Sequence, residues 1–455
     1  MEKIKVLVIN IIACLSLTIC LSQNLQKPSP SEINSAPQWA KLMYADDPNV
    51  WMVEAAYKDY YKTELFEKNY HTQYYKRWKK KFGNQVDQTG KIVPPSPTSL
   101  AQQEIAFRKK QNQEKVSNWS VIGPYLSHAE AGNMGSDQTN VYSIDQCLNQ
   151  PNYLYLGTEP GEVYKSIDQG NSWALSSKNE DFGSGVTAIE VDPNNPQIVF
   201  CGANNGVFRS IDGGLTWTNV LTQSNFGANE ILIYPNNQNL VWVASDKGLF
   251  HSADGGTTWI TLFQQKTYDI KIHPTDPSII YLLKNNPSLI KCEFLRSSDI
   301  GATWQVVGTN WYSSNDPARY DGGGRLAVTH LQPNRVYAYL IGDSKPDDYG
   351  YIGVYRSDDS GSSWQLPNGP VGGPYSTQHV NLAIGWATWT YHQGFYNCAI
   401  AVSPTNADEI LIGGLNLYKS TDAGATFSSV SGYVGGPLGL HVDMQDFRVV
   451  GNNTW

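Results

Sequence analysis

Charged residues are scarce in this 455-residue chain, because Asp, Glu, Lys and Arg together make up only 16% of it. Glycine, with 40 residues, and aromatic side chains, at 12%, are frequent by comparison. This balance is typical of an all-β protein with many turns. The sequence also lacks a P-loop, a zinc-protease motif, a nucleophile elbow and a dinucleotide-binding motif, which excludes the enzyme classes built on them.

Cysteine is also rare, and its spacing does not suit a metal site. Cys14 and Cys20 fall in an N-terminal apolar run. The other four cysteines stand singly in strand-like stretches, at Cys147, Cys201, Cys292 and Cys398. Since they lack the paired spacing of metal ligands, we interpret them as buried small side chains, with one disulfide pair as the alternative. We expect no metal and no cofactor.

Long apolar runs are absent except for one at the N-terminus. Lys3 and Lys5 precede an apolar run from Val6 to Leu21, and the small Ser22 follows it. This is the layout of a signal peptide over residues 1–22. A membrane anchor is the alternative, but the run is shorter than the roughly 20 residues that a span requires. We expect an exported protein, secreted or at the cell surface, with no stable membrane insertion after signal removal.

The net charge of −8 is divided unevenly along the chain. Residues 23–118 carry 15 Lys or Arg against 10 Asp or Glu, whereas residues 119–455 carry 16 against 30. A protein that binds nucleic acid needs a basic surface for the phosphates. The acidic C-terminal part therefore argues against a nucleic-acid partner.

An eight-residue motif occurs six times, with the pattern Ser-x-Asp-x-Gly-x-Ser/Thr-Trp. The copies are SIDQGNSW (166–173), SIDGGLTW (210–217), SADGGTTW (252–259), SSDIGATW (297–304), SDDSGSSW (357–364) and STDAGATF (420–427). The carboxylate can accept hydrogen bonds from turn amides, the glycine can adopt positive φ, and the aromatic residue begins the next strand. We interpret each motif as a hairpin turn with a structural aspartate, at Asp168, Asp212, Asp254, Asp299, Asp359 and Asp422.

This motif is the Asp-box, or bacterial neuraminidase repeat, and through it residues 119–455 resemble the Asp-box β-propellers. That family includes sialidases, xyloglucan-hydrolysing glycosidases and sortilin-type receptors. The resemblance implies a fold and not an activity, because in the family the boxes build blades and do not catalyse. The box aspartates lie 42 to 63 residues apart, the period of one four-stranded blade. We therefore expect an all-β propeller of about seven four-stranded blades at 119–455, preceded by a helical extension at 23–118.

The two ends of the expected propeller read as parts of one blade. Residues 119–123 match an outermost strand, and residues 446–455 match an innermost strand and its turn. Together they would close a seventh blade that lacks its two middle strands, which leaves unpaired strand edges. We therefore expect the sequence to be truncated at its C-terminus, within a longer chain.

The N-terminal extension has a helical apolar rhythm between about 48 and 82, and a shorter one at 99–113. Its aromatic residues, from Tyr57 to Trp78, would crowd one side, which predicts packing against the rim of the propeller. The basic cluster at 76–81 is interpreted as a solvated helix end, with a polyanion or lipid site as the alternative.

Candidate binding residues lie in long loops on the face opposite to the boxes. The loops span 307–325, 342–353, 366–397 and 430–446, and long loops on a rigid scaffold commonly carry function. The candidates are Trp311, Tyr312, Tyr320, Trp386, Trp389, Tyr391 and His441. Such rings beside carboxylates suit a glycan or a peptide, although they can equally fill the loops' own small cores.

A glycoside hydrolase needs two facing carboxylates roughly 5 to 9.5 Å apart. If the chain is a hydrolase, Asp321 and Asp443 are the candidates. His441 and Asp443 share one side of the expected inner strand, which favours a polar channel lining over a metal site completed by His379 or His392. Sialidase activity is disfavoured, because the family's Arg-Ile-Pro motif is missing and the arginines before the boxes (Arg209, Arg296 and Arg356) lie on the structural face.

Two functional hypotheses follow. The favoured one is an exported, non-catalytic propeller that binds a polysaccharide or an extracellular protein or peptide through its long-loop face. The alternative is a glycoside hydrolase acting on a β-glucan such as xyloglucan.

Overall fold

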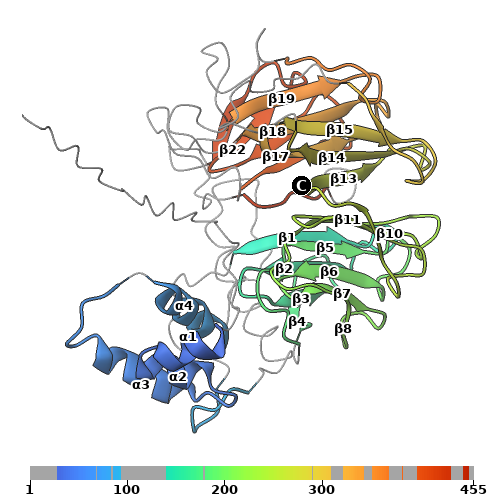
Figure 1. Cartoon of the computed structure of the whole chain (residues 1–455). Helices are drawn as coiled ribbons and strands as arrows, with labels where there is room; N and C mark the ends of the chain where they lie inside the picture. Colours follow the sequence, from blue (N-terminus) through green and yellow to red (C-terminus); the bar gives the residue numbers. More distant parts are fainter. Residues whose placement is uncertain are drawn as a thin grey trace, which may run out of the picture.

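The computed structural model describes residues 28–67, 69–83, 86–93, 140–177, 180–288, 291–308, 321–342, 351–367, 382, 397–431 and 444–449. Within these ranges, four helices precede 23 strands that form six sheets (Figure 1). No helix in the described ranges is long and apolar enough to cross a bilayer. The expected signal peptide and the expected helix at 99–113 lie outside the described residues.

The helical unit consists of α1 (Pro30–Ser35), α2 (Gln38–Tyr44), α3 (Val50–Tyr60) and α4 (Tyr70–Phe82). Ser29, Asn49 and Asn69 cap α1, α3 and α4, each accepting a hydrogen bond from a first-turn backbone N–H. The expectation of helices confined to the N-terminal segment is confirmed for the described residues.

The aromatic residues of this unit form a core of their own. It comprises Ala36, Trp39, Ala40, Met43, Tyr44, Val50, Val53, Tyr74, Tyr75 and Trp78. The rings of Tyr57 and Tyr75 stack with centroids 3.9 Å apart, and Trp39 meets both edge-on. These buried rings of α2, α3 and α4 cover one another, and the expected packing of this side against the rim of the propeller stays a prediction.

Each sheet is an antiparallel meander in sequence order. The first three contain β1 (Val141–Gln146), β2 (Leu154–Thr158), β3 (Val163–Ser166), β4 (Ala174–Leu175); β5 (Ala188–Val191), β6 (Val199–Ala203), β7 (Gly206–Ser210), β8 (Thr218–Thr222); and β9 (Ala228–Ile233), β10 (Val241–Ser245), β11 (Gly248–Ser252), β12 (Ile260–Phe263). The last three contain β13 (Thr267–Ile272), β14 (Ile280–Asn286), β15 (Lys291–Ser297), β16 (Gln305–Val306); β17 (Asp321–Val328), β18 (Val336–Gly342), β19 (Tyr351–Ser357); and β20 (Ala399–Val402), β21 (Ile410–Gly413), β22 (Leu417–Ser420), β23 (Ser428–Ser431).

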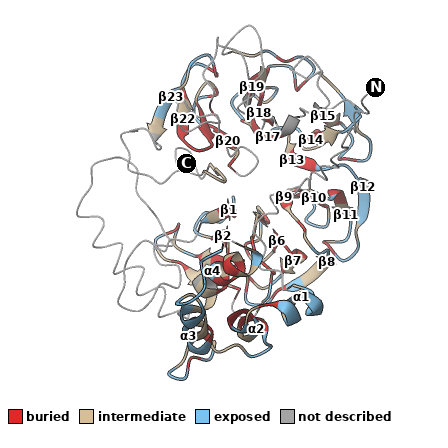
Figure 2. Cartoon of the chain, turned by 60° about the vertical axis from the view of Figure 1, so that its left-hand side comes forward, coloured by how far each residue is buried: buried red, intermediate tan, exposed pale blue. Residues whose placement is uncertain are grey.

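The sheets stack side by side around a central axis, so the molecule is an all-β propeller (Figure 2). The first strands of neighbouring sheets contact one another in the order β1, β5, β9, β13, β17, β20. Five separate apolar clusters fill the spaces between successive sheets. Second strands such as β6 and β10 are buried throughout because they have a neighbouring sheet on both faces, whereas β8 and β12 are largely exposed.

The described residues form six blades, and the expectation of about seven is corrected accordingly. Residues 119–123 lie outside the described ranges. The expected innermost strand and turn at 446–455 are described only as far as residue 449, and residues 446–449 are not assigned to any sheet. The fifth blade has three strands, with the single bridge between Arg356 and Gln365 in place of a fourth.

All six boxes form the same hydrogen-bonded turn, as the third copy illustrates. The Ser252 hydroxyl accepts from the amides of Asp254 (3.3 Å) and Gly256 (2.7 Å) and donates to the Asp254 carboxylate (2.8 Å). That carboxylate also accepts from the Thr258 amide (2.8 Å) and hydroxyl (2.7 Å). The other five copies repeat this arrangement in their own sheets. The box aspartates are therefore structural and are distributed around the ring.

Each box also bonds to the turn between the first two strands of its own blade. The amide of Gly255, for example, donates to the carbonyl of Asn239 (2.9 Å), and the other five boxes make the equivalent bond. Boxes and first turns therefore lie on one face of the propeller, as expected. We call it the box face, and the opposite face the long-loop face.

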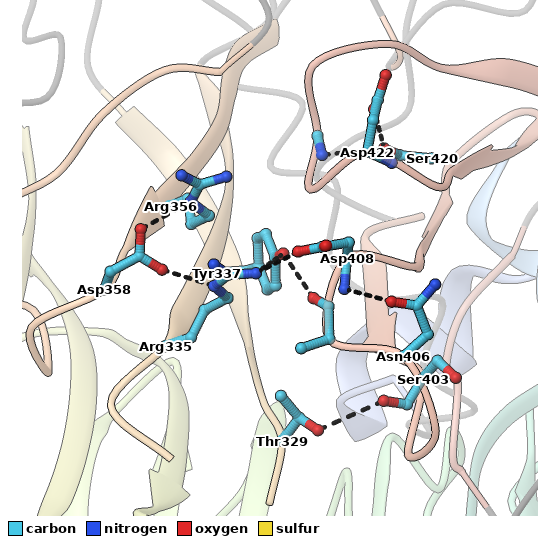
Figure 3. Close-up of polar contacts among 12 residues, drawn as sticks. Thr329, Arg335, Tyr337, Arg356, Asp358, Ser403, Asn406, Asp408, Ser420 and Asp422 are labelled. Carbon is cyan, nitrogen blue, oxygen red and sulfur yellow. Dashed lines mark hydrogen bonds and ion pairs between the residues drawn. The ribbon is translucent and has the colours of Figure 1, made fainter. Parts of the chain in front are cut away.

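Neighbouring blades are joined across the box face. Arg335 pairs with Asp358 of its own blade (2.6 Å) and with Asp408 of the next blade (2.5 Å), and the Tyr337 hydroxyl donates to the Ala407 carbonyl (2.7 Å; Figure 3). In the first two blades, Tyr155 donates to the Pro196 carbonyl (2.9 Å). These links give the box face a structural role.

The residue before each box glycine also adopts positive φ, which the sequence pattern did not reveal. The box glycines have φ between 79° and 89°, as expected. The preceding position is glycine in two copies (Gly213 and Gly255), but it is Ile300 in the fourth copy, with φ 58°. A left-handed conformation costs a β-branched residue on the order of 1–2 kcal/mol, so the fourth box is strained.

We expect Ile300→Gly to raise the free energy of unfolding by about 1 kcal/mol, because it relieves this strain where the side chain is already 36% exposed. Chemical denaturation measures the change. Gly255→Ala is the matched control: an added Cβ has no atom closer than 3.4 Å, so its expected destabilisation reports backbone conformation alone. A less stable Ile300→Gly variant would contradict the interpretation.

Candidate functional site

The sequence-predicted site residues are largely outside the described ranges. These are Trp311, Tyr312, Tyr320, Trp386, Trp389, Tyr391, His441 and Asp443. The backbone of Asp321 is described as the first residue of β17, paired with Gly342 of β18. Its position places it at the long-loop end of an inner strand. The roles assigned to all of these residues stay predictions.

The arginines that precede the boxes, in contrast, are placed clearly. Arg209 donates to the carbonyl of Gly255 in the next box, and Arg296 donates to the carbonyl of Ser360 (3.2 Å) in the box after its own. Arg356 pairs with Asp358 (3.1 Å). Their expected structural role is confirmed.

His273 and the cysteines are also placed clearly. His273 accepts amide hydrogen bonds from its own turn, from Thr275 (3.3 Å) and Asp276 (3.0 Å), so it serves as a turn residue and not as a ligand. The four described cysteines are free thiols; Cys147, Cys201 and Cys292 are buried, whereas Cys398 is half-buried beside the axis. The described residues contain no cluster of three or more side chains suited to a metal.

The inner strands bring charged side chains together around the axis, and the sequence interpretation missed this cluster. It comprises Asp145 on β1, Glu190 on β5, Glu230 on β9, Asp269 and Lys271 on β13, Arg325 on β17, and Asp446 and Arg448 from the segment 444–449. Alternate residues of a strand share one side, so Asp269 and Lys271 face the same way. A cavity of about 580 Å³ lies among several of these residues. We call this group the axial cluster.

Glu230 is the hub of the axial cluster. Its Oε1 accepts from Lys271 Nζ (2.6 Å) and from Arg448 (3.0 Å), and the same Lys271 Nζ lies 2.9 Å from Asp269. Burial opposes ionisation of Glu230, but Arg448 and Lys271 outweigh it and lower its pKa to about 2. Glu230 is therefore ionised at neutral pH, and it joins the third blade to the fourth and to residues 444–449.

Other acidic groups of the cluster link one inner strand to the next through the backbone. Asp145 accepts from the Val191 amide (2.7 Å), and Asp269 accepts from the Leu326 amide (2.6 Å). Glu190 makes the equivalent, longer contact with the Ile233 amide (3.4 Å). These bonds satisfy amides near the axis while holding adjacent blades in register.

Segment 444–449 makes the same kind of link between the sixth blade and the first. The Met444 amide donates to the Gly414 carbonyl (3.0 Å), which attaches the segment to the sixth blade. Asp446 accepts from the Ile144 amide (3.2 Å), and Arg448 donates to the Ile144 carbonyl (3.0 Å) on β1. The segment thus spans the space between the first and last blades without belonging to a sheet.

The acidic groups of the cluster outnumber its cations, and this affects their protonation. Burial raises the pKa of Asp145 to about 6, despite the nearby Arg448, and raises the pKa of Glu190 well above its usual value. Burial also raises the pKa of Asp269. The cluster therefore combines Glu230, which is held ionised, with Asp145, Glu190 and Asp269, in which burial favours the protonated form by raising the pKa.

The cavity extends toward the box face. Gln146, Leu148, Pro151, His330 and Pro404 line it at the box-face ends of inner strands or in the turns that follow. The sequence interpretation expected a ligand on the opposite face.

One feature of the sequence could have indicated the axial cluster. The strands VYSIDQ and AIEV each carry an acidic residue at the matching, next-to-last position. Spacing alone, however, could not pair these residues with their partners on β9, β13 and 444–449.

Protonation in the axial cluster predicts a pH-dependent stability. A carboxyl group with a raised pKa stabilises the fold while it is protonated, and this contribution is lost as the pH rises from about 4 through 6. Asp145→Asn keeps an acceptor for the Val191 amide but cannot titrate. We expect the variant to lose less stability between pH 4.5 and pH 7 than the parent protein, by on the order of 1–3 kcal/mol.

Denaturant unfolding at several pH values measures this difference. Asp59→Asn serves as the control, because the Asp59 side chain is 78% exposed in the helical unit and should leave the pH slope unchanged. Equal slopes for Asp145→Asn and the parent protein would contradict the prediction.

The ion-pair hub yields a second prediction. Arg448→Met leaves Glu230 buried with one cation fewer, so we expect the free energy of unfolding to fall by about 2–4 kcal/mol. Adding Glu230→Gln removes the uncompensated charge, and the double variant should recover part of the loss in a double-mutant cycle. Strictly additive effects would show that the two side chains do not interact.

Comparison with known proteins gives distant similarities. No family model matches the chain. It is 28% identical over 185 residues to a xyloglucanase of a Paenibacillus species, covering 37% of this chain and 16% of that protein. It is 23% identical over 344 residues to xyloglucanase Xgh74A of Acetivibrio thermocellus, covering 68% of this chain and 34% of that protein. The chain thus spans about a third or less of the length of these curated relatives.

Solved structures that resemble the chain are also propeller proteins of low sequence identity. The GH74 xyloglucanase of Xanthomonas campestris has a TM-score of 0.46 at 17% identity, covering 63% of this chain and 45% of that one. An ancestral GH74 enzyme has a TM-score of 0.45 at 22% identity, covering 61% and 36%. YCF48 from Cyanidioschyzon merolae has a TM-score of 0.38 at 13% identity, covering 64% and 84%. The propeller assignment rests on this chain's own strand order.

Proposed function

We propose that this chain is the propeller of an exported glycoside hydrolase that acts on a β-glucan of the xyloglucan class. The observation that carries the proposal is the 344-residue similarity to a protein named as a xyloglucanase. A second, shorter similarity is to another xyloglucanase. These similarities favour the hydrolase over the non-catalytic binding protein that the sequence alone favoured.

The structure supports the long-loop face as the place for catalysis. The box face is occupied by box turns and by links between blades such as that of Arg335. On the other face, β17 begins at Asp321, and Gly323 has φ 150° where an added Cβ would meet the Tyr268 ring at 3.0 Å. The backbone two residues after Asp321, the proposed catalytic aspartate, is thus closely packed against the Tyr268 ring.

We assign the two catalytic carboxylates to Asp321 and Asp443. Asp443 directly precedes Met444, whose amide bonds to Gly414 just beyond the long-loop end of β21. Asp321 stands at the long-loop end of β17, and β17 contacts β20 of the sixth blade. Met444 and Asp321 therefore lie toward the same end of the axis, and we propose that Asp443 acts there as well. One would act as general acid and the other as base or nucleophile, depending on their separation.

A non-catalytic glycan-binding propeller is the second candidate. The described carboxylates near the axis favour it, since Asp145, Asp269 and Asp446 each accept a backbone amide hydrogen bond that joins two inner segments. Because these three carboxylates make structural hydrogen bonds, they are not free to act as catalytic groups. Catalysis would then depend on the proposed loop aspartates, Asp321 and Asp443, alone.

Incubation of the full chain with soluble polysaccharides, followed by a reducing-sugar assay, tests the proposal. We expect release from xyloglucan, reduced about a thousandfold in Asp321→Asn and in Asp443→Asn because each removes an acid or base. Asp276→Asn, in an exposed box-face turn, is the control and should keep full activity. Sugar release that survives in both catalytic variants would refute the assignment, and retention on the polymer without release would support the second candidate.

A further inference from the structure

The axial cavity has the size and the opening of a small-molecule site. Its volume of about 580 Å³ lies within the range of roughly 300–1,000 Å³ that is usual for such sites. It runs along β17 from Arg325 to His330, which lies in the turn after the strand. Leu148 also lines it and is 67% exposed, so the cavity is open to solvent at the box face. It is thus separate from the proposed catalytic site on the long-loop face.

The wall of the cavity is apolar at its box-face end. Five apolar lining residues lie there, at the ends of inner strands or in the turns that follow them: Leu148, Pro151, Val328, Val402 and Pro404. Arg325 lies three residues before Val328 on β17, which is about 10 Å deeper at the usual rise of a strand. A ligand that enters from the box face therefore meets an apolar wall first and a guanidinium below it.

Arg325 differs from the other two cations that line the cavity. Lys271 lies 2.6 Å from Glu230, and Arg448 lies 3.0 Å from the same carboxylate. Arg325 instead donates a hydrogen bond to the Tyr268 carbonyl, and no carboxylate of a described residue forms an ion pair with it. A guanidinium has five N–H groups, so Arg325 retains donors for a ligand in the cavity.

The charges around the cavity can accept one further negative charge. The lining contains as many carboxylates as cations, namely Glu230, Asp269 and Asp446 against Lys271, Arg325 and Arg448. The other two acids of the axial cluster are Asp145 and Glu190, in which burial favours the protonated form by raising the pKa. A monoanion therefore faces a balanced lining, whereas a dianion such as phosphate needs more cations than the cavity offers.

A carboxylate is the ligand group that fits Arg325, because a planar guanidinium matches it with two parallel hydrogen bonds. The remainder of the ligand has to be apolar, since it lies against side chains such as Val328 and Val402. A neutral sugar fits less well, because its hydroxyl groups would face these apolar side chains without hydrogen-bond partners.

We propose that the axial cavity binds a small monocarboxylic acid with an apolar body, its carboxylate on Arg325 and its body against the apolar wall at the box face. The contacts of Glu230 with Lys271 and Arg448 stay in place, so the structural role of the axial cluster is kept. The site does not depend on the proposed hydrolase function.

Isothermal titration of the full chain with octanoate tests the proposal, at pH 5.5, where Asp145 with its pKa of about 6 is largely protonated. We expect Arg325→Gln to weaken octanoate binding at least about tenfold, because it removes the charge that pairs with the carboxylate. Octan-1-ol has the same apolar body without the charge. We expect it to bind the parent protein at least about tenfold more weakly than octanoate and to be insensitive to Arg325→Gln.

A second variant decides the question if Arg325→Gln does not fold. Leu148→Asp places a carboxylate on the exposed rim of the cavity and removes an apolar contact, so it should weaken octanoate binding about tenfold. Leu215→Asp is the matched control, because Leu215 is 83% exposed in the second box and is not among the residues that line the cavity. Both variants should keep the unfolding midpoint of the parent protein, since both side chains are exposed.

Unchanged octanoate affinity in Arg325→Gln would overturn the proposal. So would equal octanoate affinity of Leu148→Asp and Leu215→Asp, because it would place the binding outside the axial cavity. Octan-1-ol that binds as tightly as octanoate would contradict it as well, since the carboxylate would then not be the group recognised.

Discussion

The propeller depends on how carboxylates near the axis satisfy backbone amides of the next inner strand. Asp145, Asp269 and Asp446 each reach from one inner segment to the amide of its neighbour, and Glu230 gathers Lys271 and Arg448 between them. A sheet that stands radially leaves its first strand with one edge facing the axis, where amides need a partner. Side chains supply that partner here, so the charges at the centre are primarily structural.

The two faces of the propeller differ in how strongly structural contacts constrain them. The box face is constrained by box turns, by first turns and by ion pairs such as Arg335 with Asp408 (Figure 3). The long-loop face carries the beginnings of the inner strands, including Asp321. A rigid end and a variable end are the usual arrangement of a scaffold that supports function in its loops. The axial cavity belongs to the constrained end, where Glu230 and the neighbouring Asp145 serve the packing of the blades.

Sequence reasoning was most successful where one residue type meets a local requirement. The motif Ser-x-Asp-x-Gly predicted the box turns because its hydrogen bonds form within five residues, as between Ser252, Asp254 and Gly256. It missed the strain at Ile300, since a variable position carries no signal for positive φ. The axial cluster was missed for another reason: Glu230 and Arg448 are far apart in the chain, and only the closure of the ring brings them within 3.0 Å. The blade count of the described residues was mispredicted because it depends on which surfaces meet in three dimensions.

A crystal structure of the full chain with a bound xyloglucan oligosaccharide tests the central claim most directly. If the axial charges are structural and function lies in the long loops, the sugar will occupy the long-loop face beside Asp321, and the contacts of Glu230 with Lys271 and Arg448 will be unchanged. A sugar bound in the axial cavity, with Arg448 displaced from Glu230, would contradict the account.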